Sequence, residues 1–135
     1  MIAGFGEAVR EMQPSITQRY EKTTALKNYL LERLSQMHDI HINSSANGSS
    51  YIVNFSVKGI RSEIMLHFLE SMGIYVSSGS ACSKGSKSGV LSAYKISDDH
   101  ADSALRISFS CDTTEEELIA LTDAIVQGQN QLIHK

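Results

Sequence analysis

The spacing of apolar residues in the first third of the chain predicts helices. Apolar side chains between residues 15 and 37 recur mostly at three- and four-residue steps, which is typical of an amphipathic helix with one buried face. The residues on that face are Ile16, Tyr20, Leu26, Leu30, Leu34 and Met37. Pro14 suits the turn before this helix. The preceding IAGFGEAVREM, residues 2–12, is also helix-like, but the pattern offers no partner for its apolar side.

Alternating patterns further along the chain predict strands. YIVNFSV, residues 51–57, follows a polar loop at 43–50 and places Tyr51, Val53, Phe55 and Val57 on one face. ALRISFS, residues 104–110, alternates in the same way. Its inward residues are Leu105, Ile107 and Phe109, so Arg106 and Ser108 face the other side. A short strand is also expected at IYV, residues 74–76.

Three more helical segments complete the pattern. One has the apolar residues Ile64, Met65, Phe68, Leu69 and Met72, and Gly73 stands where a left-handed residue ends a helix. A brief helical turn is expected at 90–94. Thr114 and Glu117 form a capping box for a C-terminal helix whose buried side carries Leu118, Leu121, Ile125 and Leu132.

The order of these elements predicts an α/β protein of the two-layer α+β kind. We expect a small mixed or antiparallel sheet with helices mainly on one face. The length of 135 residues suits a single domain spanning residues 1–135. No repeat, charged tail or second domain boundary interrupts the sequence.

Composition narrows the function classes. A net charge of −3 gives no positive field for nucleic acid or an anionic membrane. No run of about 18 apolar residues and no export leader is present, so a cytoplasmic protein without a membrane segment is expected. The two cysteines, Cys82 and Cys111, lack CxxC spacing, and in a reducing compartment we expect both thiols to be free.

Residues 77–89, SSGSACSKGSKSG, offer almost nothing to bury and are expected to form a mobile loop. Cys82 lies six residues beyond Val76, so at roughly 3.3 Å per residue its thiol could range on the order of 20 Å. Lys84 and Lys87 would modestly favour the nucleophilic thiolate. Composition alone leaves two interpretations open, a reactive thiol or a flexible linker that contains a cysteine.

Residue identity favours the reactive thiol. SSGSACS, followed by VLSA and SALRISFSCDTTEEEL, resembles the C-terminal segment of cysteine desulfurases, pyridoxal-phosphate enzymes of the class-V aminotransferase superfamily. The stretch VNFSVKGIRSEIMLHFLESMGIYVSSGSAC resembles that family's approach to its catalytic loop. IAGFGEAV resembles its interdomain helix, whose end would be residues 1–13. The resemblance covers nearly the whole chain.

The resemblance implies removal of sulfur from L-cysteine, which leaves L-alanine and a persulfide on Cys82. It implies that Arg106 holds the substrate carboxylate, for which a planar, permanently charged guanidinium is suited. The loop residues that would support the nucleophile are Ser78, Gly79, Ser80, Ala81 and Ser83. A sulfur-acceptor protein, either an iron-sulfur scaffold or a tRNA-thiolation protein, would then take the sulfur. The complete enzyme is expected to be a homodimer.

The resemblance also implies that a large domain is missing. The cofactor lysine and most cofactor contacts precede the matched region in that family, so this chain alone should neither bind pyridoxal phosphate nor turn over cysteine. The pair His134 and Lys135 is interpreted as coincidence. Lys95 stands where relatives often have glycine. Two alternatives stay open: a fragment of a selenocysteine lyase or another class-V lyase, and a stand-alone sulfur-relay domain without catalysis.

Other candidate motifs fail on spacing or context. GSACSKGSKS is not a phosphate loop, because five residues separate Gly79 from Gly85 and Ser86 stands where lysine is required. The five histidines show no ligand spacing with a cysteine, so no metal site is predicted. DDHAD, residues 98–102, is interpreted as turn and cap chemistry. Cys111 is expected to be a small, half-buried residue at the end of a strand.

Overall fold

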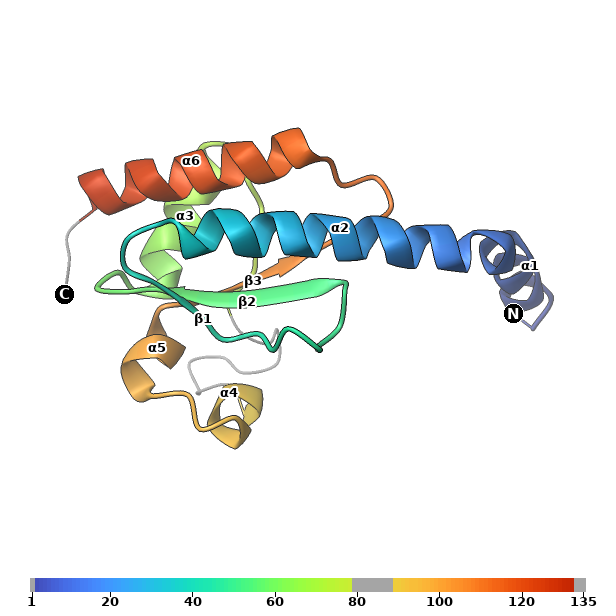
Figure 1. Ribbon diagram of the computed structural model, residues 1–135, viewed down its shortest axis with the longest axis horizontal. Coiled ribbons are helices and arrows are strands. Elements are labelled where there is room, and N and C mark those ends of the chain that lie inside the picture. Colours follow the sequence, from blue (N-terminus) through green and yellow to red (C-terminus); the bar gives the residue numbers. More distant parts are fainter. Residues whose placement is uncertain (1, 79–88, 133–135) are drawn as a thin grey trace.

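The computed structural model describes residues 2–78 and 89–132 (Figure 1). A three-stranded antiparallel sheet carries a layer of long helices on one face and only short helical turns on the other. This arrangement confirms the predicted two-layer α+β class and the antiparallel form of the sheet. Five of the predicted site residues, Gly79, Ser80, Ala81, Cys82 and Ser83, lie outside the described residues.

The sheet has the order β1-β2-β3. Its strands are β1 (Ile40–Ile42), β2 (Ile52–Val57) and β3 (Ala104–Ser108). Phe55 of β2 is paired with Ile42 on one side and with Leu105 on the other. The register therefore aligns the apolar residues of all three strands on one face, as alternation requires. Strand β1 was not predicted, because three residues are too few to show a period.

The predicted strand at residues 74–76 was wrong. Only Ser77 pairs with the sheet, through a single bridge to Arg106. The N–H of Ile74 is already used by the end of α3 (Ser62–Ser71), where it donates to the carbonyl of Leu69 at 3.0 Å. Gly73 supplies the left-handed turn of this Schellman cap, with φ of +77°, as its position in the sequence predicted. The N–H of Ile74 is therefore unavailable to a neighbouring strand, and the segment meets the sheet only at Ser77 among the described residues.

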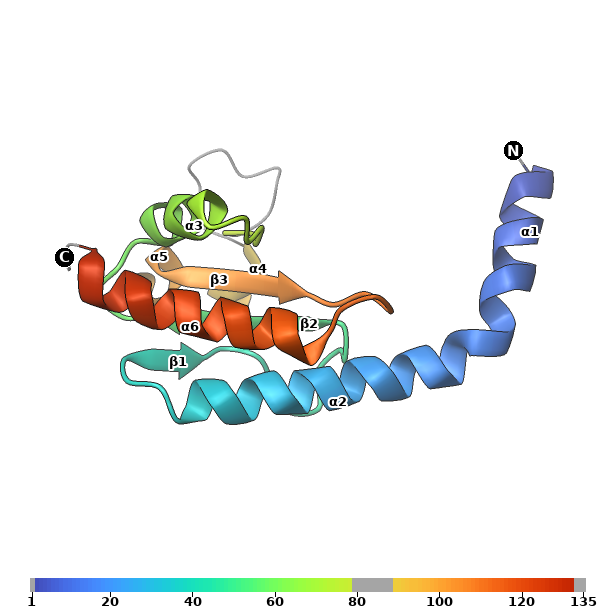
Figure 2. The same ribbon diagram turned by 90° about the horizontal axis from the view of Figure 1, so that it is seen from above.

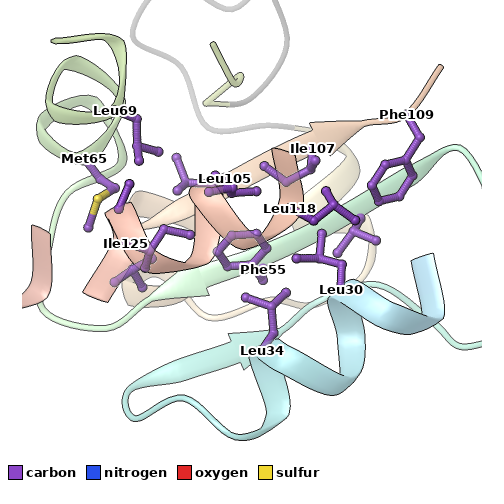
Figure 3. Close-up of a cluster of buried hydrophobic side chains, with 14 of the residues drawn as sticks. Leu30, Leu34, Phe55, Met65, Leu69, Leu105, Ile107, Phe109, Leu118 and Ile125 are labelled. Carbon is purple, nitrogen blue, oxygen red and sulfur yellow. The ribbon is translucent and has the colours of Figure 1, made fainter. Parts of the chain in front are cut away.

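Three helices cover the apolar face of the sheet. They are α2 (Ile16–Ser35), α3 and α6 (Glu115–Gln131), and they lie together on one side of β2 and β3 (Figures 1 and 2). Their buried side chains interdigitate with Phe55 and Leu105 of the sheet (Figure 3). The helical contributors are Leu26, Leu30, Leu34, Met65, Leu69, Leu118, Leu121 and Ile125. Each fully buried side chain of this size stabilises the fold by about 1.5–3 kcal/mol.

The opposite face of the sheet is polar. Alternation places His41, Asn43, Asn54, Ser56 and Arg106 there. Two short helices, α4 (Gly89–Ala93) and α5 (Asp98–Asp102), lie on this side (Figure 1). Residues 98–102 thus form a helical turn capped by Ser97, whose side chain accepts from the N–H of His100, and not only the turn that was predicted.

Two helix segments stand partly outside the core. Helix α1 (Ile2–Met12), followed by the 3₁₀ turn η1 (Gln13–Ser15), has no buried residue and projects away from the body (Figure 2). The first turns of α2 extend beyond the sheet as well, so Ile16 and Tyr20 are 55% and 56% exposed, although the pattern placed them on a buried face. Tyr51, predicted inward, is 40% exposed because it lies just before β2. Ile64 and Met72 of the predicted apolar face of α3 are likewise exposed.

The C-terminal helix begins as the sequence predicted. The Thr114 side chain accepts from the N–H of Glu117, and the Glu117 carboxylate accepts from the N–H of Thr114, which completes the capping box. Within residues 2–78 and 89–132, no helix combines the length and apolar character needed to cross a bilayer.

Candidate functional site

A cavity of about 360 Å³ lies on the polar face of the sheet. Its polar lining comes from Lys27, Asn43, Ser44, Ser45, Gly48, Ser49, Asn54 and Arg106, and its apolar lining comes from Ile52, Val90, Leu91, Tyr94 and Ile96. One wall is therefore hydrogen-bonding and the other is aliphatic and aromatic. Such a mixture is typical of sites for small polar ligands that carry a short apolar part.

Arg106 faces this cavity from β3, as the alternation of the strand predicted. Its side-chain Nε is buried and has no hydrogen-bond partner among the described residues. A buried donor without a partner costs roughly 1–3 kcal/mol, more when it belongs to a charged group. Because Arg106 also lines the cavity, its guanidinium is a candidate binding group for an anionic ligand.

A chain of hydrogen bonds runs across the sheet beside Arg106. The Nδ2 of Asn43 donates to Oδ1 of Asn54 at 2.8 Å and to Oγ of Ser56 at 2.8 Å. The hydroxyl of Ser56, which is fully buried, donates to the carbonyl of His100 at 2.6 Å. Asn43 and Asn54, which line the cavity, are held in place by this row of bonds and form its polar floor. Oδ1 of Asn43 is the second buried side-chain atom without a partner in the described part of the chain.

Lys27 shapes the rim of the cavity. It is 3% exposed, and its three N–H donors are shared among the carbonyl oxygens of Ser45, Ala46, Gly48 and Ser49, which lie 3.0–3.3 Å from Nζ. The ammonium thus gathers the loop at residues 45–49 as a small cation would, and burial of its charge is compensated by these bonds. Sequence reasoning missed Lys27. Its one signal was a lysine directly after Leu26 and three residues before Leu30, on the buried side of the helix.

The apolar wall follows the segment that contains Cys82. Val90 and Leu91 of α4 and the nearby Tyr94 line the cavity. Lys95, which ends this stretch, has φ of +56°, a conformation that glycine adopts freely and lysine rarely does.

The other end of that segment is fixed to Arg106 itself. Arg106 donates its backbone N–H to the carbonyl of Ser77 at 2.7 Å, and Ser77 donates back to the carbonyl of Arg106 at 3.2 Å. Ser78, a predicted support residue, follows directly and is half-buried. The structure therefore brings Arg106 and α4 to one cavity and fixes Ser77 to the backbone of Arg106.

Cys111 lies elsewhere. It is half-buried beyond the end of β3, as predicted, with its Sγ 3.2 Å from Nη1 of Arg19 and its carbonyl bonded to Nζ of Lys22. It is not among the residues that line the cavity. These contacts anchor the loop before α6 to α2.

His100 and His41 form a second feature of the polar face. Their rings are stacked, with centroids 4.0 Å apart and planes 12° from parallel. Burial, then the charges of His41 and Lys58, lower the pKa of His100 below its usual value, while Asp99 opposes the shift. In the described ranges, no three His, Cys, Asp or Glu side chains gather in a way that could hold a metal ion.

Comparison with known proteins identifies the family to which this chain belongs. The family profile of class-V aminotransferases matches residues 1–121. The chain is 34% identical over 98% of its length to a NifS/IcsS protein homolog of Lactobacillus delbrueckii subsp. bulgaricus, and covers 36% of that protein. It is 38% identical over 87% of its length to cysteine desulfurase IscS of Photobacterium profundum, and covers 29% of it. The chain thus spans about a third of these relatives.

The fold also has solved counterparts. A NifS-like protein of Rickettsia africae superposes on 96% of this chain with a TM-score of 0.80 at 24% sequence identity, and the chain covers 34% of that structure. A likeness at this identity shows the fold.

Proposed function

Since the chain belongs to the class-V aminotransferase family, we propose that it is the C-terminal small domain of a cysteine desulfurase. The reaction removes sulfur from L-cysteine and places it on the Cys82 thiol, so L-cysteine and a thiol become L-alanine and a persulfide. Arg106 binds the substrate carboxylate. This chain contributes the carboxylate site and the sulfur carrier.

The observation that carries this proposal is that Arg106 lines the cavity while its buried Nε has no partner among the described residues. The described part of this cavity offers no anion of its own, because its lining contains no Asp or Glu. A carboxylate would accept two parallel bonds from the guanidinium fork. The apolar wall from α4 would face the short side chain of cysteine.

The position of Cys82 in the sequence supports its role. The chain from Ser77, which is paired with Arg106, to Cys82 is five residues long and can span at most about 18 Å. The same segment returns to the cavity at Val90. A thiol tethered at both ends to the carboxylate site can meet the sulfur of a substrate that is bound there.

Pyridoxal phosphate does not fit the described residues of this chain. Its attachment requires a free lysine amine, and Lys27, the one lysine that lines the cavity in the described ranges, has its Nζ committed to four carbonyl oxygens. We therefore assign the cofactor to the rest of the enzyme. The apolar side of α1, where Ile2 and Phe5 are 91% and 74% exposed, is the surface that this remainder would cover.

The persulfide requires a recipient and a compartment. A sulfur-acceptor protein, for iron-sulfur cluster assembly or for thiolation, would take sulfur from Cys82. A thiol that must return to its free form after each transfer suits the reducing cytosol. The complete enzyme is proposed to be a homodimer.

The test uses the complete enzyme, with Cys82→Ser compared with the matched Cys111→Ser. We expect Cys82→Ser to abolish the protein-bound persulfide detected by mass spectrometry and to reduce sulfide release to background, because serine offers no thiolate. Cys111→Ser should retain both. Persulfide formation that is unchanged in Cys82→Ser, or lost only in Cys111→Ser, would overturn the proposal.

A further inference from the structure

Asn54 shares the floor of the cavity with Arg106. The two residues are direct cross-strand partners on β2 and β3, and both line the cavity. Arg106 spends both backbone groups on Ser77, on the side of β3 away from β2, and the carbonyl of Asn54 accepts from Asn43 on the β1 side. The Asn54–Arg106 pair is therefore the kind without mutual backbone bonds, in which side chains lie closest.

The orientation of the Asn54 amide follows from the proton count of its neighbours. The single hydroxyl proton of Ser56 is used on the carbonyl of His100, so Oγ of Ser56 must accept from Asn43. The group of Asn43 that faces Ser56 is then its NH₂, which also reaches Asn54 at 2.8 Å. Asn54 must therefore present its oxygen to Asn43.

This chain of bonds leaves the NH₂ group of Asn54 unused. Within the described residues, Nδ2 of Asn54 donates to no other group, while its Oδ1 and backbone groups are engaged. The cavity floor thus offers two neighbouring sets of donors, the Asn54 amide and the Arg106 guanidinium. Two donors side by side complement the two oxygens of one carboxylate.

We infer that Asn54 is a second binding group for the substrate α-carboxylate, and that the Ser56–Asn43 bonds hold its amide in the donating orientation. The inference rests on the proposed function and names a residue that sequence patterning did not single out. It also gives α5 a role, because the carbonyl of His100 accepts the hydroxyl proton of Ser56. This bond fixes the direction of the hydrogen bonds that Asn43 donates to Ser56 and Asn54.

The decisive substitution is Asn54→Asp in the complete enzyme. Aspartate has the same shape and can still accept from Asn43, but it points an anionic oxygen where the NH₂ was. We expect the Kd of L-alanine, the product with the same carboxylate, and the KM of L-cysteine each to rise roughly 100-fold, and Asn54→Ala to give about 10-fold. The control is Asn47→Asp, an exposed position in the loop before β2 that does not line the cavity.

Cysteamine, which is cysteine without the carboxylate, separates binding from folding. The affinity for cysteamine should change less than about 2-fold in Asn54→Asp, because the lost partner is absent from this ligand. Equal losses for both ligands, or L-alanine binding equal to that of Asn47→Asp, would overturn the inference while wild-type desulfurase activity leaves the proposed function intact. A wild-type enzyme that neither binds L-alanine nor releases sulfur would overturn both.

Discussion

The two faces of the sheet are built from alternate residues of the same strands, yet they are assembled for opposite purposes. Val53, Phe55 and Leu105 are 0% exposed and packed against three long helices. Their neighbours Asn54 and Arg106 line a cavity, and each has a side-chain donor without a partner in the part of the chain that the structure describes. Burial of apolar area stabilises the first face, whereas the second has side-chain donors that find no partner among the described residues. The hydrophobic core and the cavity lining are therefore separated by a single residue step along β2.

The sharpest way to break this comparison is to substitute adjacent residues of β2. Phe55→Ala should lower the free energy of unfolding by about 3–5 kcal/mol, because it leaves a cavity under α2 and α6. Asn54→Ala, on the other face, should cost about 1 kcal/mol or less. Urea unfolding of the chain, followed by circular dichroism, measures both. Similar losses for the two variants would show that the polar face is structural as well.

Lys27 joins α2 to the loop at residues 45–49, and its substitution should give the next largest loss of stability. Lys27→Met keeps the length of the side chain but removes the cation from four carbonyl oxygens, so we expect a loss of about 2 kcal/mol. Lys22→Met is the matched control, since that exposed lysine of the same helix donates to one carbonyl, that of Cys111. Its expected loss is below about 0.5 kcal/mol. Equal urea midpoints for the two variants would contradict this role of Lys27.

The smallest expected effect is on the pH dependence of stability, and it comes from His100 on the polar face. The folded-state pKa of His100 is lowered by burial and by His41 and Lys58, so the unfolded chain binds a proton more readily. The contribution of His100 is therefore complete above about pH 6.5 and is lost as the pH falls through the lower folded pKa. His100→Gln should flatten the decline of Tm between pH 7.5 and 5, whereas the exposed His67→Gln should not. Parallel curves for wild type and His100→Gln would refute this linkage.

Local signals predicted the elements that have a period or a cap. The alternation of residues 104–110 placed Leu105 inward and Arg106 outward, and the Thr114–Glu117 box located the start of α6. The failures were residues whose local pattern competes with a longer-range contact. Residues 74–76 do not form the predicted strand, and the N–H of Ile74 is used at the end of α3. Ile16 and Tyr20 are exposed because α2 is longer than the sheet that it covers.

The candidate site shows the same division. The side of Arg106 was predictable from alternation, and the role of Cys82, which stays a prediction, came from the resemblance of its segment. Lys27, Asn43 and Asn54 could not have been chosen from sequence, because each acts through partners that lie 10 to 22 residues away along the chain.

The order of residues fixed which side chains alternate, where helices begin and end, and which family the chain resembles, because these depend on neighbours within a few positions. Tertiary structure alone decided that Nε of Arg106 has no partner among the described residues, that Asn54 presents its amide oxygen to Asn43, and that Lys27 binds the loop at residues 45–49. Those outcomes depend on hydrogen-bond partners supplied by other strands and helices, and no periodicity in the sequence records them.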